Sequence, residues 1–580
     1  MSNKTEQIIT SDTAHKPLPI GISDYKEAVS DYYYVDKTLL IKDFLDTIPK
    51  VSLFTRPRRF GKTLNMDMLR VFFEKTKEDT SVYFQDKKIW GCGDKYRSHQ
   101  GKYPVIFLTF KDLKFHTWNE TLEKMRSILA NEFARHGTIL SNSIQNDFDL
   151  TYYQKITNKT ATEVEVTDAL SLLSRVLHEC YQIAPIMIID EYDTPIQQGY
   201  LSDFYEHIIF FMRNLFSGGF KDNHHLSYGF MTGILRVAKE SIFSGMNNLR
   251  INSIMENRYS SYFGFTKEEI RHIVNDYHLS DKFDEICSWY DGYRFGDEDI
   301  FNPWSVLNYL DNNATPGTFW QSTGDNSIIR QIVASADEDT TDHLRRLMNG
   351  ESISAYVDMS VIYPEIQQNP STIYSFLLAA GYLKQIKQQT AYNGDYICDL
   401  AIPNQEIGRI FEKEILSALS ATISQSTAAT IRQAMKQQDI PTIEKSLRKF
   451  LRESISSFDY AQETFYHGLL LGLTAVMNNL YRVTSNRESG MGRYDIQLKP
   501  LDPKLPGILI EVKVLPSNTP PNTVNDMLKE LSQTALIQID QKNYADDMRK
   551  DGMKQILKIG VACYHKDVVI SSVLEGNTHG

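Results

Sequence analysis

Apolar strands alternate with amphipathic helices over the first 240 residues of this 580-residue chain. Four mainly apolar runs have the length of buried strands, and they lie at 51–54, 103–110, 183–190 and 226–235. Three segments space their apolar positions three or four apart, as helices do, and they lie from 63 onward, near 117–136 and near 165–182. Strands that alternate with helices predict an α/β fold with a parallel sheet covered by helices on both faces.

The pattern changes after about residue 240. Two long segments, 265–345 and 365–450, have mostly helical spacing, and Asn302 followed by Pro303 predicts the start of one helix. Strands return at 494–499, 507–514 and 558–563, with a helix near 523–541. The sequence therefore predicts four parts: a flexible leader at 1–17, an α/β domain at 18–260, a helical region at 261–440 and a small α/β domain at 441–580.

Amino-acid composition and net charge exclude some classes of protein. Hydrophobic residues make up 42% of the chain and charged residues 23%, as in an ordinary globular protein. The net charge of −11 excludes a protein that coats nucleic acid with its whole surface. Residues 441–580 are nearly neutral, with 17 Lys or Arg against 16 Asp or Glu, so a polyanion is better tolerated there.

The cysteines, the first 17 residues and the longest apolar stretch indicate where in the cell the protein is expected. Five cysteines, at 92, 180, 287, 398 and 563, are too scattered for a C-x-x-C zinc or redox site and fit a reducing cytosol. The polar first 17 residues lack the apolar core of a signal peptide. The longest apolar stretch, 469–477, is too short to span a bilayer. We expect a cytoplasmic protein that does not enter a membrane.

A phosphate-binding loop is indicated where the first strand meets the next helix. Gly61-Lys62-Thr63 opens that helix, whose backbone N–H groups, Lys ammonium and Thr hydroxyl suit phosphate oxygens and Mg²⁺. The full pattern requires glycine at position 56, where this chain has Arg56. Arg56, Arg58 and Arg59 lie beside Gly61-Lys62-Thr63 and either contact phosphate or form a solvated turn. An ordinary helix start is the alternative interpretation.

The strand at 183–190 supplies the second half of a P-loop ATPase. It ends in Asp190, which can hold Mg²⁺, and Glu191, which can orient the attacking water. An acidic turn without chemistry is the alternative, but the order and spacing of the two motifs favour the ATPase. The next strand ends near Thr232, a candidate sensor of the γ-phosphate, and Arg236, which is either a charge stabiliser or a surface residue.

Asp495, Glu511 and Lys513 form a second candidate site. Strand alternation places Glu511 and Lys513 on one face and apolar residues on the other, and Asp495 on the preceding strand can meet them. Two carboxylates suit Mg²⁺ or Mn²⁺, which activates water, and the lysine can stabilise charge at a scissile phosphate. A surface strand that merely carries Glu and Lys is the alternative, which the apolar flanks disfavour.

Several stretches resemble the bacterial AAA-ATPase-like proteins that carry a C-terminal PD-(D/E)XK nuclease-like domain. They are Pro19-Ile-Gly-Ile22, Tyr34-Val-Asp-Lys37, Phe54-Thr-Arg-Pro-Arg-Arg-Phe-Gly-Lys-Thr63, Ile189-Asp-Glu-Tyr-Asp193 and Thr232-Gly-Ile-Leu-Arg236. Residues 290–296, 301–304 and 319–323 are similar to the middle region of that family. The resemblance covers about 16–568, and the loop of the family usually has this Arg-Pro-Arg-Arg-Phe form without the first glycine.

The resemblance implies a role for each part. It implies a P-loop AAA-ATPase-like domain at 18–260, a helical lid or linker at 261–440 and a restriction-endonuclease-like PD-(D/E)XK domain at 441–580. The implied ATP site consists of Arg59, Phe60, Gly61, Lys62, Thr63, Asp190, Thr232 and Arg236, with Mg²⁺ at Thr63 and Asp190. The implied nuclease metal ligands are Glu463, Asp495 and Glu511, and the implied substrate contacts are Arg493, Gln538 and Tyr544.

The leading hypothesis is an ATP-binding, ATP-hydrolysing protein coupled to a metal-dependent nuclease that acts on nucleic acid, DNA in particular, and is gated by nucleotide. The alternative is a nucleotide-dependent switch or scaffold whose nuclease-like domain binds without cutting. An ATPase with a decayed nuclease is a third reading, disfavoured because Asp495, Glu511 and Lys513 are all present. A homo-oligomer is a further expectation, with Arg236 or Arg250 as the arginine that acts across subunits.

Overall fold

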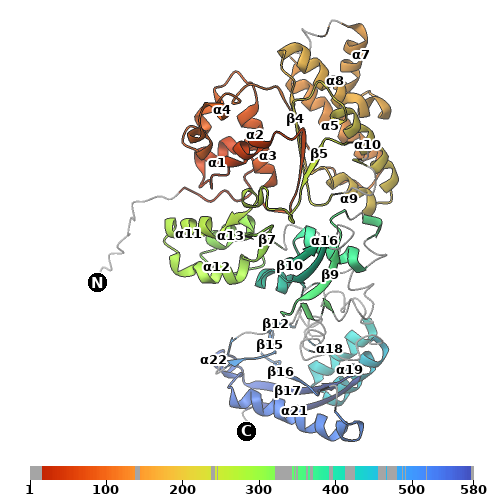
Figure 1. The fold of residues 1–580 in the computed structure, drawn as a ribbon. Coiled ribbons are helices and arrows are strands. Elements are labelled where there is room, and N and C mark those ends of the chain that lie inside the picture. The colour runs from red at the N-terminus through yellow and green to blue at the C-terminus, as the bar shows by residue number, and fades with distance from the viewer. Residues whose placement is uncertain are drawn as a thin grey trace, which may run out of the picture. The chain divides into compact units, whose positions relative to one another are not determined.

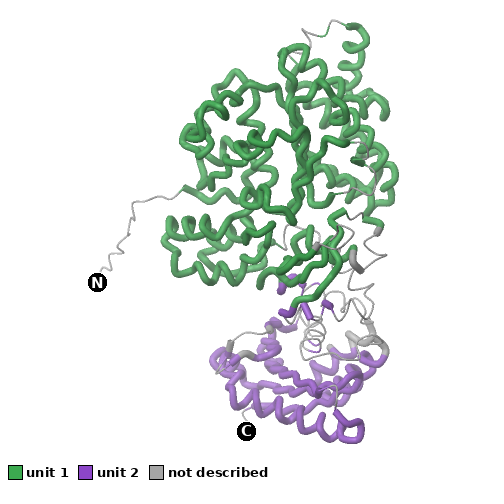
Figure 2. The backbone as a smooth tube through the Cα atoms, viewed as in Figure 1, with its two compact units in different colours: residues 1–324, 352–407 green, residues 325–351, 408–580 purple. Residues whose placement is uncertain are grey.

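The chain divides into two compact units, which Figure 2 colours separately. The first comprises residues 1–324 and 352–407, and the second comprises residues 325–351 and 408–580. The computed structural model describes residues 16–137, 144, 146–236, 242–243, 246–320, 343–344, 346–347, 350–360, 363–365, 370–390, 396–411, 414, 425–454, 466, 470, 480–485, 488–489, 492–516 and 519–576. Apart from Lys16 and Pro17, the expected leader therefore lies outside the described residues. In the part of the chain that is described, no helix is long and apolar enough to cross a membrane.

The first unit is built on a five-stranded parallel sheet of order β2-β3-β4-β1-β5. Its strands are β1 (Val51–Thr55), β2 (Val105–Thr109), β3 (Ile186–Asp190), β4 (Tyr228–Gly233) and β5 (Leu249–Asn252). Every residue of β1 and β3 is buried, because helices cover both faces of the sheet. The four predicted strands are confirmed. The short fifth strand, which mixes polar and apolar residues, is an addition.

Helices pack on both faces of this sheet (Figure 1). One group comprises α1 (Tyr25–Asp31), α2 (Leu39–Thr47), α3 (Lys62–Phe73) and α4 (Asp94–Arg97). The other comprises α5 (Trp118–Arg135), α7 (Asp147–Thr157), α8 (Glu163–Tyr181), α9 (Thr194–Leu201) and α10 (Tyr205–Phe220). Helix α8 begins with a capping box, in which Thr162 and Glu165 satisfy each other's backbone N–H groups. The helices expected near 117–136 and 165–182 are thus confirmed.

The middle region contains strands as well as helices. Its helices are α11 (Lys267–Asp276), α12 (Phe283–Tyr290), α13 (Pro303–Asp311) and α16 (Pro370–Ala380). One sheet consists of β6 (Phe265–Thr266), β7 (Tyr293–Phe295) and β8 (Glu298–Phe301), and another of β9 (Ile353–Val357), β10 (Lys384–Thr390) and β11 (Tyr396–Ala401). The sequence predicts mostly helix here, and these two sheets are a correction. Strands of two to four residues, such as β6–β8, are too short to show a period of two.

The second unit contains a mixed five-stranded sheet of order β12-β15-β16-β17-β18. Its strands are β12 (Tyr481–Ser485), β15 (Ile496–Pro500), β16 (Gly507–Val514), β17 (Gln555–Tyr564) and β18 (Asp567–Gly576), beside a small hairpin of β13 (Glu488–Ser489) and β14 (Gly492–Arg493). Only β16 and β17 pair in parallel, and the crossover between them is α21 (Val524–Gln541), followed by the short α22 (Asp546–Lys550). The three predicted strands and the helix are confirmed, and the edge strands β12 and β18 are additions.

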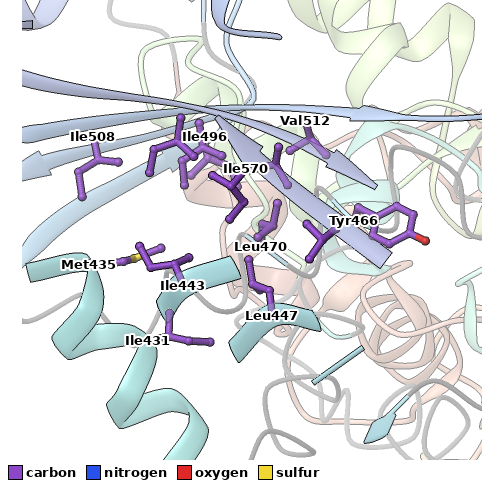
Figure 3. Close-up of a cluster of buried hydrophobic side chains, with 14 of the residues drawn as sticks. Ile431, Met435, Ile443, Leu447, Tyr466, Leu470, Ile496, Ile508, Val512 and Ile570 are labelled. Carbon is purple, nitrogen blue, oxygen red and sulfur yellow. The ribbon is translucent and has the colours of Figure 1, made fainter. Parts of the chain in front are cut away.

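Two helices cover one face of this C-terminal sheet. Figure 3 shows side chains of α18 (Gln425–Gln437) and α19 (Ile440–Ser454) beneath the apolar side chains of the strands. Ile431 and Leu447 belong to the same buried cluster as Ile508 and Val512. The compact unit therefore begins before the expected boundary at residue 441, which would separate the two helices.

Candidate functional site

The segment between β1 and α3 has the backbone of an anion-binding loop. Arg59 (φ 69°) and Gly61 (φ 78°) adopt left-handed conformations two residues apart, and α3 begins at Lys62. Left-handed residues placed among right-handed ones turn successive N–H groups toward one point, and the helix N-terminus adds its dipole. Glycine at position 61 adopts this conformation without strain. The loop can therefore hold phosphate although it lacks the first glycine of the usual pattern.

Arg56, which replaces that glycine, is wholly buried and supports the loop. Its guanidinium donates to the carbonyl oxygens of Thr55, Asn252 and Tyr259 at 2.8, 2.7 and 3.4 Å. It also lies 5.1 and 5.2 Å from the centres of two phenylalanine rings. Burial lowers the pKa of Arg56 to about 10, which leaves it charged at neutral pH. Neither phosphate contact nor a solvated turn describes Arg56; it ties the start of the loop to the end of β5.

Arg56→Ala should lower the free energy of unfolding by about 2–4 kcal/mol, because it removes a buried cation and leaves carbonyl oxygens unpaired. Thermal unfolding of the full chain measures the effect. The control is Arg258→Ala, which changes an exposed arginine one residue from Tyr259. Equal unfolding temperatures for both variants would contradict the supporting role of Arg56.

A cavity of about 440 Å³ lies over the loop, within the size range of small-molecule sites. Its charged and polar lining includes Arg58, Arg59, Lys62, Thr63 and Glu191. Apolar side chains line it as well, including Ile20, Ile22, Val35, Trp304 and Leu307. The cavity thus combines an anion-binding wall with surface on which a nucleoside can pack.

The polar side chains expected to hold a metal ion gather around Asp190 at the end of β3. The carboxylate accepts hydrogen bonds from the Thr63 hydroxyl at 2.8 Å and from the Thr232 hydroxyl at 2.6 Å. The Thr232 hydroxyl also accepts from the backbone N–H of Glu191 at 3.1 Å. Burial raises the pKa of Asp190, although both hydroxyls oppose the shift. Thr232 is wholly buried, so its visible role is to position Asp190 and Glu191.

Lys62 and Glu191 face the same cavity. The Lys62 ammonium donates to the backbone carbonyls of Arg56 and Pro57 at 3.0 and 2.8 Å, and burial lowers its pKa. Glu191 has a left-handed backbone (φ 54°), a conformation that costs free energy in a residue with a side chain. Its carboxylate accepts from the Thr194 hydroxyl at 3.2 Å and is half-buried. The structure therefore brings together the lysine, the threonine and both acidic residues of the predicted ATP site.

The predicted arginines take other positions. A guanidinium nitrogen of Arg236 lies 3.5 Å from the Ser360 hydroxyl, and Arg250 is exposed on β5. Buried Asp193, which sequence reasoning missed, accepts from the backbone N–H groups of Ile234 and Leu235 at 2.7 and 3.0 Å. Asp193 thus fixes the chain that follows β4. Its place two residues after Glu191 was the signal that could have identified it.

The middle region holds the phosphate loop through aromatic side chains. The Arg59 guanidinium lies 4.3 Å from the Trp304 ring centre. Phe60 packs against Tyr293 and Phe295 of β7, with ring centres 4.9 and 5.1 Å apart. The stretch 290–296, which resembles the middle region of the family, therefore packs against the loop.

Glu406 is a buried carboxyl behind this packing. It is wholly buried, and one of its oxygens accepts from the backbone N–H of Trp320 at 2.9 Å. Burial raises the pKa of Glu406 from 4.5 to about 7, opposed by the Trp320 and Phe319 amides and the Ser305 hydroxyl. Tyr293 is a titratable group close enough to interact with it.

This pKa predicts a pH-dependent stability. Between about pH 4.5 and pH 7 the folded chain keeps a proton on Glu406 that the unfolded chain has lost. The stabilisation is therefore complete below pH 4.5 and is lost as pH rises through 7. We expect Glu406→Gln to match wild type at pH 5 and to be more stable at pH 8, by roughly 2–4 kcal/mol.

Thermal unfolding at pH 5 and pH 8 measures this difference. Glu298→Gln, at an exposed position on β8, is the control and should shift neither value. If the unfolding temperatures of Glu406→Gln and wild type differ by the same amount at pH 5 and pH 8, a raised pKa of Glu406 is contradicted.

The second candidate site lies on β16. The Lys513 ammonium donates to Glu511 Oε1 at 3.2 Å, and Gln538 of α21 donates to the same oxygen. Asp495 Oδ2 accepts from the backbone N–H of Val512 at 2.7 Å. Asp495 lies in a bend directly before β15 and not on a strand, which corrects the expected placement. The three residues predicted from the sequence nonetheless come together.

The electrostatics of this site suit a cation. Glu511 is only 2% exposed, and burial raises its pKa, as does the negative charge of Asp495, whereas Lys513 opposes the shift. Its second oxygen, Oε2, is buried and has no hydrogen-bond partner. A buried unpaired carboxylate oxygen is costly, and a divalent cation beside it would remove that cost.

The donor set fits a hard divalent ion. Within the described ranges, no three His, Cys, Asp or Glu side chains gather where one metal could be held, so Asp495 and Glu511 stand as a pair. Mg²⁺ is commonly bound by one or two carboxylates and keeps several waters, which this pair satisfies. The further expected ligand, Glu463, lies outside the described residues.

The three expected substrate contacts differ in where the structure places them. Gln538 touches Glu511 and also lies 3.4 Å from the Tyr544 hydroxyl, so it positions the carboxylate. Tyr544 is 3% exposed and packs within the core behind the site. Arg493 pairs through its backbone with Glu488, while its side chain is outside the described part of the chain.

Comparison with known proteins agrees with this architecture. Residues 19–243 match the family described as predicted AAA-ATPase, and residues 461–573 match the PD-(D/E)XK nuclease superfamily. The chain therefore carries an AAA-ATPase-like domain followed by a domain of the PD-(D/E)XK nuclease superfamily, as the resemblance implied. It is also 24% identical over 406 residues to the "Uncharacterized protein in vnfD 5'region" of Azotobacter chroococcum mcd 1, a match that covers 70% of each chain.

Proposed function

We propose that this protein binds and hydrolyses ATP at the phosphate loop and cleaves nucleic acid, DNA in particular, at the carboxylates of its C-terminal domain. One observation carries the proposal: a single chain brings together two sets of side chains whose chemistry suits phosphate. Thr63, Asp190 and Glu191 meet at the first site, and Asp495, Glu511 and Lys513 meet at the second.

At the first site, each residue has a role that its position supports. The loop N–H groups and Lys62 would bind the β- and γ-phosphates, and the apolar lining would pack against the nucleoside. Glu191 would accept a proton from water as the water oxygen bonds to the γ-phosphorus and the bond to the bridging oxygen of ADP breaks. Thr63 and Asp190 would hold Mg²⁺, which neutralises charge on the phosphates.

At the second site, the orphaned Glu511 oxygen and Asp495 would hold Mg²⁺, with Mn²⁺ as the other suitable ion. The ion supplies a Lewis acid that lowers the pKa of water and neutralises the scissile phosphate. Lys513 would stabilise the extra negative charge at phosphorus while water replaces one ester oxygen. Gln538 would keep Glu511 oriented throughout.

The proposal also includes a cellular location, a role for each domain and an assembly. The five cysteines are free thiols, as expected for the reducing cytoplasm in which we place the protein. The roles follow the proposed domains, an ATPase at 18–260, a lid or linker at 261–440 and a nuclease at 441–580, with α18 packed on the sheet of the nuclease. A homo-oligomer remains part of the proposal as the assembly in which Arg236 or Arg250 acts across subunits.

The purified full-length chain tests the proposal. We expect phosphate release from ATP with Mg²⁺ and cleavage of supercoiled plasmid with Mg²⁺ or Mn²⁺, and we expect chelation by EDTA to stop both. ATP that binds without phosphate release, together with intact plasmid under every condition, would replace this proposal with the nucleotide-dependent switch.

A further inference from the structure

The chain passes between the two compact units at three points. It leaves the first unit after Gly324, returns at Ser352 and leaves again after Ile407. Two buried residues precede the outward crossings: Trp320 before the first and Glu406 before the last. These residues belong to the first unit and are hydrogen-bonded to each other, with the Trp320 N–H 2.9 Å from a Glu406 oxygen. The described residues that precede the two outward crossings are therefore tied together at Trp320 and Glu406.

The same tryptophan contacts the phosphate loop. Its indole Nε1 donates to the carbonyl oxygen of Arg58 at 3.4 Å, and its ring packs against Tyr382 with centres 4.9 Å apart. Phe319, the residue before Trp320, is connected to the loop as well. Its carbonyl oxygen accepts from Nε1 of Trp304 at 3.1 Å, and the Trp304 ring lies against the Arg59 guanidinium. Successive loop residues thus connect to successive residues at the first crossing.

The surroundings of Glu406 leave polar atoms free to form new bonds. Glu406 Oε2, the Tyr293 hydroxyl, Asn302 Nδ2 and the Ser305 hydroxyl are buried and lack a partner at good hydrogen-bond geometry, although Ser305 is close enough to Glu406, and Asn302 to Tyr293, to interact. Tyr293 and Ser305 both interact with Glu406, and Tyr293 packs against Phe60 of the loop. Unsatisfied buried groups make an arrangement easier to exchange for another, which is how a packed element acquires two states.

We propose that Trp320 and Glu406 form a relay through which nucleotide at the phosphate loop sets the arrangement of the chain at these two residues, the described positions that precede its exits from the first unit, and so regulates the C-terminal carboxylate site. The relay rests on the proposed function, since it presumes that both sites are active. It adds no chemistry. Trp320 acts through the Arg58 carbonyl and Glu406 acts through Trp320, so both are positioning residues.

Two substitutions test the relay without changing a residue of the ATP site or of the carboxylate site. Trp320→Phe removes the indole donor but keeps an aromatic ring, and Glu406→Gln keeps the size of the side chain. We expect ATP to change the plasmid cleavage rate of wild type at least about threefold, and the change to vanish in both variants while ATP turnover stays within about twofold. Trp289→Phe, in α12, is the matched control and should keep the ATP effect. Variants with the full ATP effect, or a wild type without one, would overturn the relay.

A measurement independent of activity follows the relay in the unmodified protein. Amide hydrogen exchange with a non-hydrolysable ATP analogue should slow at 57–63 and change at 404–407 and 353–357. Slowed exchange at the loop with unchanged exchange at both other segments would overturn the relay while leaving the ATP site intact. Unchanged exchange at the loop would instead show that the proposed ATP site is wrong, and the relay would fail with it.

Discussion

Glu511→Gln and Lys513→Ala should each reduce metal-dependent plasmid cleavage by about a hundredfold or more. Glutamine keeps the shape of the side chain but removes the negative charge that the buried Oε2 offers to a cation. Alanine at 513 removes the ammonium that lies 3.2 Å from Glu511 and would stabilise charge at phosphorus. The initial rate of conversion of supercoiled to nicked plasmid, with Mg²⁺ and with Mn²⁺, measures both effects.

Matched controls lie on the helix that follows. Glu530→Gln and Lys529→Ala change exposed residues of α21 and should leave cleavage at the wild-type rate. If Lys513→Ala cleaves plasmid as fast as wild type, the activity belongs to a contaminant or another site. In that case the nuclease assignment fails, even if the ATPase assignment stands.

Glu191→Gln should lower ATP turnover by about a hundredfold while ATP binding is retained. The amide cannot accept the proton of the attacking water, but it keeps the size of the side chain at the cavity wall. Lys62→Ala should act differently and weaken ATP binding itself, because it removes the ammonium that would neutralise the β- and γ-phosphates. Phosphate release and equilibrium binding of a fluorescent ATP analogue distinguish the two effects.

Glu206→Gln, an exposed change on α10, is the control for this pair and should alter neither quantity. Turnover by Glu191→Gln at the wild-type rate would show that another group activates the water. Retained binding by Lys62→Ala would place the nucleotide elsewhere than the loop.

The features predicted from the sequence are those set by local pattern. The buried strands β1 and β3 appear as mainly apolar runs because both faces of the sheet are covered. Glu511 and Lys513 fall on one face of β16 because side chains alternate along a strand. The alternating residues Ile508, Ile510 and Val512 enter the core on the opposite face. Asn302 accepts from the Trp304 N–H at 3.0 Å, as expected of the residue that begins a helix.

The features that escaped prediction depend on contacts distant in sequence. Arg56 looks like a phosphate-contacting or solvated arginine until β5 and the turn at Tyr259 supply its carbonyl partners. Trp320 lies in the stretch 319–323, to which no role is assigned, and Glu406 lies in no motif. Only the folded middle region pairs the two and brings Trp320 to the Arg58 carbonyl. Short strands such as β6 and β7 are held by pairing with β8, which no local periodicity reveals.

The net charge of the whole chain also differs from that of its C-terminal part. The whole-chain value of −11 argues against nucleic acid, yet the proposed cleavage site lies in the nearly neutral residues 441–580. There, an ion at Asp495 and Glu511 would supply the positive charge that a basic patch supplies in other proteins. A local, metal-bridged contact is therefore compatible with an acidic chain.

A crystal structure of the full chain with Mn²⁺ and a non-hydrolysable ATP analogue tests the central claim most directly. The account predicts anomalous scattering from Mn²⁺ beside Asp495 and the Glu511 Oε2 atom, and the analogue with its phosphates at the N–H groups of the 59–63 loop. An analogue bound away from that loop, together with no Mn²⁺ at the two carboxylates, would contradict the account.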